Sequence, residues 1–153
     1  MTATADHRYR PRPLRALNRV PPALLARTGL DLDPDRLLHR ARRRTGLADF
    51  GPDDFEAPYR RLLAAYADEA GLNAVGVLSV RTYLLRLLAN RLLMERDRAR
   101  HPEIAEQRIE RPLVILGLPR TGSTLLHELL AQDPDLRTPL SWEAMLPSPP
   151  PEA

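Results

Sequence analysis

The chain contains no cysteine, no lysine and no long apolar run. Without cysteine it has neither a disulfide framework nor a thiolate metal site, and a cysteine nucleophile is excluded as well. No run approaches the roughly 18 apolar residues of a membrane-spanning helix, and residues 1–19 lack the apolar core of a signal peptide. We therefore expect a cytoplasmic protein without a membrane span.

Because lysine is absent, all 23 basic residues are arginine, and the formal net charge is +3. From Arg81 to Arg96 the arginines recur every five residues, which spreads them around a helix instead of forming a basic stripe. The densest run, residues 42–44, falls at the end of a predicted helix, where positive charge is favourable. Aromatic residues make up only 5% of the chain, so side chains that could stack on bases are scarce. We expect no nucleic-acid partner.

Residues 112–126 are the most informative stretch of the chain. An apolar run, Leu113 to Leu116, ends at Gly117, a short loop follows, and an amphipathic segment begins at Leu125. This order predicts a strand, a loop of the size that holds a phosphate, and a helix. Such a loop turns backbone N–H groups toward one point at a helix N-terminus, where the macrodipole also favours an anion.

The loop matches the phosphate-loop template G-x-x-x-x-G-K-[ST] at Gly117, Gly122 and Thr124. It departs from the template at the lysine, where Ser123 stands. Nucleoside triphosphatases use that lysine on the β- and γ-phosphates, so its absence argues against this class. Arg120, inside the loop, offers instead a planar guanidinium suited to two oxygens of a phosphate or sulfate. An ordinary turn between a strand and a helix remains the alternative.

The segment from Gly117 to Leu126 resembles the 5′-phosphosulfate loop of the sulfotransferase family, in its bacterial branch with arginine in the loop. The resemblance extends through residues 133–136 and 138–143, and covers about residues 111–146. It implies 3′-phosphoadenosine-5′-phosphosulfate as the donor and transfer of a sulfuryl group to an acceptor hydroxyl or amine of a small molecule. No metal is expected, because a sulfate carries less charge than a terminal phosphate. The implied donor-binding residues are Pro119, Arg120, Thr121, Gly122, Ser123 and Thr124.

The resemblance also suggests two catalytic residues. Arg120 would neutralise charge as the leaving phosphate forms. Glu143 is the candidate general base for an acceptor hydroxyl, with a plain surface or helix-terminal carboxylate as the alternative. Trp142 is expected either in the acceptor pocket or in a core. His127 is expected to support the site indirectly or to be a packed side chain, with a catalytic base as the alternative.

Upstream of the loop the sequence predicts helices. One begins after Asp33 and stops at Gly46, a second covers about residues 53–70, and a third about residues 79–100. Two apolar stripes are predicted to form a core. They consist of Phe55, Tyr59, Leu62, Leu63 and Tyr66 in the second helix, and of Leu84, Leu87, Leu88 and Leu92 in the third.

We therefore expect an α/β protein with a P-loop-type three-layer fold, of which only the first strand-loop-helix unit is present, preceded by an all-α region. The expected divisions are an extended segment over 1–20, a helical region over 21–110 and the start of the sulfotransferase domain over 111–153. A short second strand is predicted near Leu136. One strand-loop-helix unit cannot cover its own sheet edges, so we expect the chain to be the N-terminal part of a longer enzyme and inactive by itself.

Two other functions stay open at this point. One is a P-loop phosphotransferase related to kinases, against which the missing lysine counts. The other is a non-catalytic helical interaction fragment with a vestigial loop. The sequence leaves the acceptor and the oligomeric state open.

Overall fold

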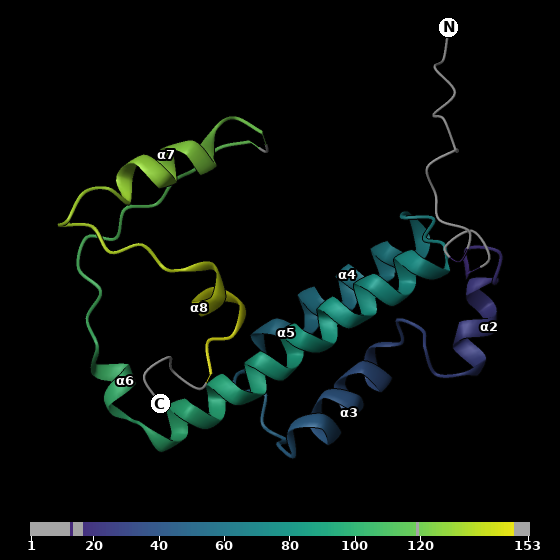
Figure 1. Ribbon diagram of the computed structural model, residues 1–153. Helices are drawn as coiled ribbons and strands as arrows, with labels where there is room; N and C mark the ends of the chain where they lie inside the picture. Colours follow the sequence, from purple (N-terminus) through teal and green to yellow (C-terminus); the bar gives the residue numbers. More distant parts are fainter. Residues whose placement is uncertain (1–12, 14–16, 119, 149–153) are drawn as a thin grey trace, which may run out of the picture. The chain divides into compact units, whose positions relative to one another are not determined.

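The computed structural model describes residues 13, 17–118 and 120–148 (Figure 1). Most of the predicted extended segment, residues 1–20, lies outside these residues, and the part that is described is not extended: residues 13 and 17 are helical and residues 18–20 form a turn and a bend. The chain divides into two units, Met1–Arg96 and Asp97–Ala153, which are described separately. None of the helices in the described ranges combines the length and apolar character required to cross a membrane.

The first unit contains five helical elements in the described residues. They are α2 (Pro22–Arg27), α3 (Pro34–Thr45), the 3-10 helix η2 (Asp53–Phe55), α4 (Glu56–Asp68) and most of α5 (Ala74–Arg100). In Figure 1 the teal α4 and α5 are the long helices.

Helix α3 has the ends that the sequence predicts. The Asp33 carboxylate accepts a hydrogen bond from the backbone N–H of Arg36 at 2.8 Å, so it satisfies one of the donors that a helix start leaves unpaired. Pro34 takes the first helical position, where its missing N–H costs nothing. Gly46 ends the helix with φ +71°, a left-handed conformation that glycine adopts without penalty.

Helix α5 begins five residues earlier than the predicted start at residue 79. The Asn73 side chain accepts a hydrogen bond from the Gly76 N–H at 2.9 Å, and its carbonyl accepts from the Val77 N–H. Asparagine is a strong N-cap, so Asn73 was the overlooked signal in the sequence.

A core forms where α3, α4 and α5 pack together. The predicted stripes are confirmed for most of their members, but Leu62 and Leu87 are exposed because α4 and α5 each turn only one narrow face inward. Burial raises the pKa of Tyr59, so its hydroxyl stays neutral and donates to the Pro34 carbonyl at 3.1 Å. The buried members of this core are Leu37, Leu38, Ala41, Phe50, Tyr59, Leu63, Leu84, Leu85, Leu88 and Leu92.

The second unit contains the end of α5, then α6 (Glu103–Glu106), α7 (Ser123–Leu130) and α8 (Ser141–Met145). The predicted strand over 112–117 is not formed: these residues have no regular secondary structure. No strand occurs near Leu136 either, where the chain turns at Asp133. A strand exists only through hydrogen bonds to a neighbour, and the described residues supply no neighbour for this one.

Candidate anion-binding loop

The loop between residues 117 and 122 leads into the N-terminus of α7. Two of its residues have left-handed backbone conformations, Arg120 with φ +67° and Gly122 with φ +89°. Glycine adopts this region freely, whereas an arginine there stores backbone strain. Pro119, one of the predicted donor-binding residues, lies outside the described residues.

Thr121 braces the loop from inside. Its hydroxyl donates a hydrogen bond to the Leu118 carbonyl at 2.7 Å. A Cβ at Gly117 would lie 3.0 Å from the same hydroxyl oxygen, so a side chain at that position would push Thr121 aside. The phosphate-loop pattern indicated Gly117 and the resemblance to the 5′-phosphosulfate loop indicated Thr121, but the sequence did not reveal that the two residues lie in contact.

The first turn of α7 carries open hydrogen-bond donors. The first bond of the helix runs from the Leu126 N–H to the Gly122 carbonyl at 3.0 Å, so the N–H groups of residues 123–125 precede the ladder. No side chain caps them, and no acidic residue lies in this turn. Ser123 and Thr124 are exposed. The N–H groups and the helix dipole therefore favour an anion at this end of α7.

Arg120 is exposed beside this turn, and within the described residues it forms no ion pair with a carboxylate. Its guanidinium is therefore available to an anion from solution. In the described ranges no group of three or more histidine, cysteine, aspartate or glutamate side chains could hold a metal ion.

Glu143 lies at the start of α8 with both carboxylate oxygens engaged. One accepts from the Leu140 N–H at 2.7 Å and the other from the Arg137 guanidinium at 2.8 Å. Its side chain is only 18% exposed. The carboxylate thus caps α8, and no hydrogen bond or ion pair within the described residues joins it to Arg120.

The other two residues that the sequence singled out are accessible. Trp142 is 45% exposed, so it is not a packed core residue in the structure. The His127 ring lies partly exposed on α7, with Nδ1 4.0 Å from the Glu128 carboxylate.

This loop lies within a stretch of the chain that is similar to known proteins. Residues 112–152 match the family model of the sulfotransferase family. The chain is also similar to a crystal structure of the sulfotransferase STF1 from Mycobacterium tuberculosis H37Rv, with 40% sequence identity and a TM-score of 0.68. That match covers 78% of this chain and 34% of the mycobacterial one, so the chain spans about a third of that enzyme's length. None of the curated proteins compared with the chain matches it. Over the part of the enzyme that it spans, the chain belongs to the sulfotransferase family.

Proposed function

We propose that the chain is the donor-binding part of a sulfotransferase that uses 3′-phosphoadenosine-5′-phosphosulfate. The observation that carries this proposal is the turn at residues 120–124: within the described residues, the N–H groups at the start of α7 have no side-chain cap and the neighbouring Arg120 forms no ion pair. The family match over residues 112–152 supports it. A sulfate and the phosphate attached to it present acceptor oxygens only, which suits a site made of donors and one guanidinium.

The P-loop fold is part of this proposal. We infer that residues 112–117 become a strand when parallel neighbours supply hydrogen bonds, since their apolar character suits a strand buried on both faces. The helical region over 21–110 and the sulfotransferase domain beginning at 111 remain the divisions we propose.

The bound donor would supply the sulfuryl group and an adenosine 3′,5′-bisphosphate leaving group. The N–H groups of residues 123–125 would hold its anionic end and fix the direction of attack. Arg120 would stabilise the charge that develops on the leaving oxygen, and the Ser123 and Thr124 hydroxyls would donate further hydrogen bonds. Thr121 would keep the loop closed through its bond to Leu118.

Glu143 is the proposed general base for an acceptor hydroxyl. Each carboxylate oxygen of Glu143 already accepts a hydrogen bond, one from Arg137 and one from the Leu140 N–H. To accept the proton, one oxygen must lose that bond or accept the proton beside it. The Arg137 side chain is largely exposed, so this ion pair is the weaker of the two restraints. The acceptor is proposed to be a small molecule with a hydroxyl or amine, and the compartment to be the cytoplasm.

Calorimetry separates this proposal from a phosphotransferase. The chain should bind adenosine 3′,5′-bisphosphate without magnesium, and Arg120→Ala should weaken the binding by about 1.5–3 kcal/mol, the range for a hydrogen bond to a charged group. The expected affinity is low, because the chain spans only about a third of the length of the related enzyme. Binding of ATP that requires magnesium, together with no response to the bisphosphate, would favour the phosphotransferase and contradict our proposal. No binding of either nucleotide would favour a non-catalytic role.

A further inference from the structure

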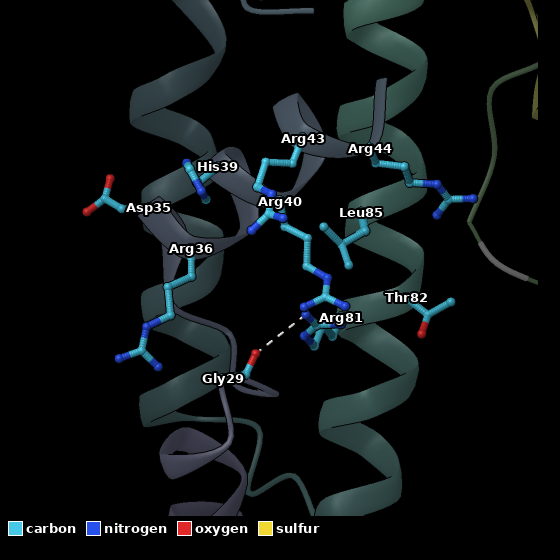
Figure 2. A pocket seen from close by; sticks show the side chains of 10 residues that line it. All are labelled: Gly29, Asp35, Arg36, His39, Arg40, Arg43, Arg44, Arg81, Thr82 and Leu85. Carbon is cyan, nitrogen blue, oxygen red and sulfur yellow. Dashed lines mark hydrogen bonds between the residues drawn. The ribbon is translucent and has the colours of Figure 1, made fainter. Parts of the chain in front are cut away.

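A basic pocket lies in the first unit, between α3 and α5 (Figure 2). Its volume is about 870 Å³, within the usual range for small-molecule sites. Five arginines line it, four from α3 and one from α5, together with residues that include His39, Thr82 and Leu85. The five arginines are Arg36, Arg40, Arg43, Arg44 and Arg81.

The arginines of α3 share one face of that helix. Their positions follow the spacing i, i+4, i+7 and i+8 from Arg36, which places them next to one another on the surface. Like charges at this spacing destabilise a helix, so the arrangement is unfavourable without an anion. The run at residues 42–44 by itself indicates only a positive helix end, whereas the basic face becomes evident when the spacing is followed back to Arg36.

The carboxylates near the pocket are already paired. Asp35 accepts a hydrogen bond from Arg60 of α4 at 2.7 Å. Asp31 accepts from Arg36 at 2.7 Å. Within the described residues, no ion pair with a carboxylate is formed by the remaining four arginines, Arg40, Arg43, Arg44 and Arg81.

Arg81 is a buried cation in this pocket. Only 8% of Arg81 is exposed, and within the part of the chain that the structure describes its Nε is buried without a hydrogen-bond partner. A long hydrogen bond of 3.5 Å runs from its Nη2 to the Gly29 carbonyl. Burial, and then the nearby charge of Arg40, lower the pKa of Arg81. A buried cation with an unsatisfied donor is costly, and a bound anion would remove that cost.

We propose that this pocket binds a small polyanion that carries two phosphate or sulfate groups. One group would accept hydrogen bonds from Arg81 and Arg40, which approach each other from the two helices in Figure 2. The second would lie against Arg43 and Arg44 toward the C-terminal end of α3. Four guanidiniums that form no ion pair within the described residues match the charge of a pyrophosphate-like ligand. The rest of the pocket volume has room for the organic group to which such a ligand is attached. The site is separate in sequence from residues 117–124 and does not depend on their proposed function.

The test is calorimetry on the 153-residue chain with pyrophosphate as the probe. Wild type should bind one pyrophosphate at this pocket, with an affinity that falls as salt is added. Arg40→Gln and Arg43→Gln should each weaken binding at least about tenfold, since each removes a charge-assisted hydrogen bond. Arg61→Gln, an exposed arginine of α4 outside the pocket, is the matched control and should change the affinity less than about twofold.

Thermal unfolding gives a second readout that a structural role would not produce. Without an anion, Arg40→Gln should raise the unfolding midpoint, because it removes the repulsion on Arg81. With pyrophosphate, the midpoint should rise in wild type and stay nearly constant in Arg40→Gln. Arg81→Lys keeps the buried charge without the guanidinium fork and should also bind more weakly.

Two results would overturn the inference. One is pyrophosphate binding of equal strength in wild type, Arg40→Gln and Arg43→Gln. The other is binding that Arg120→Ala abolishes while the pocket variants retain it, which would place the anion at the loop. Binding that survives Arg120→Ala and is lost in Arg40→Gln supports the pocket, whatever the bisphosphate titration shows.

Discussion

Arg120 occupies a backbone conformation that an arginine adopts only at a cost of about 1–2 kcal/mol. Glycine would remove that strain, so the guanidinium is the feature that an arginine adds at this position. Arg111 has a similar left-handed conformation, with φ +51°, but lies outside the loop. Arg111 can therefore serve as a control for Arg120, because both have a left-handed backbone but only Arg120 is expected to contact the donor.

Arg120→Gly should relieve the strain and weaken adenosine 3′,5′-bisphosphate binding by about 1.5–3 kcal/mol, the range for a hydrogen bond to a charged group. Arg111→Gly should relieve similar strain and leave the binding unchanged. Calorimetry on both variants checks this prediction. Equal binding by Arg120→Gly and wild type would remove Arg120 from the donor site.

Glu143 has two roles to separate, the cap of α8 and the proposed base. In the longer enzyme that we propose, Glu143→Gln should lower turnover by about 10²–10⁴-fold with little change in donor affinity, as expected for loss of a general base. An amide oxygen can still accept from the Leu140 N–H, so α8 should keep its cap. Steady-state kinetics and circular dichroism measure the two roles.

The control for Glu143 is its ion-pair partner. Arg137→Gln removes the 2.8 Å bond but leaves the carboxylate in place. It should change turnover much less than Glu143→Gln does. A decrease below about threefold in Glu143→Gln would assign the base to another residue.

At the scale of single elements, the helix ends are the features that the sequence predicts best. Asp33 and Gly46 mark α3 because a cap acts within a few residues of the chain. Asn73 marks α5 in the same way and would have given its start. The local pattern over 112–117 predicts a strand that the structure does not form, because a strand also needs a hydrogen-bonding partner elsewhere in the fold.

The two candidate sites also differ in whether they depend on local sequence or on contacts between distant segments. The loop at residues 117–124 is a contiguous motif, so the sequence contains nearly all of its information. The pocket depends on Arg81 being buried opposite α3, which only the packing of α3 against α5 creates. The spacing of the arginines in α3 predicts a basic face on that helix. It does not predict that this face lies opposite the buried Arg81 of α5.

Asp33→Ala tests the contribution of the cap to α3. It removes the acceptor of the Arg36 N–H and should lower the free energy of unfolding by about 1 kcal/mol. Asp68→Ala is the control, since Asp68 is exposed at the last residue of α4, where a negative charge is slightly unfavourable. That variant should be neutral or slightly stabilising. Urea unfolding followed by circular dichroism measures both, and equal destabilisation would argue against the cap.

At the scale of the whole chain, the two units differ in how they treat apolar side chains. Those of the first unit bury a common core across three helices. In the second unit, large apolar residues remain exposed along the segment before α7 and on α7 itself. They include Ile109, Leu113, Val114, Leu116, Leu118, Leu125 and Leu129. Exposed apolar residues in such a number, next to a segment with strand character, favour association between chains.

The chain by itself should therefore associate in solution and show no sulfuryl transfer. Light scattering should give a mass above that of a 17.3 kDa monomer, increasing with concentration. Leu116→Glu should reduce the association, because Leu116 is 88% exposed and lies within the predicted strand. Leu62→Glu, at an exposed leucine of α4, is the control and should not. A monodisperse monomer that transfers sulfate from labelled donor would show that the exposed segment needs no partner and that the donor site is complete within these 153 residues.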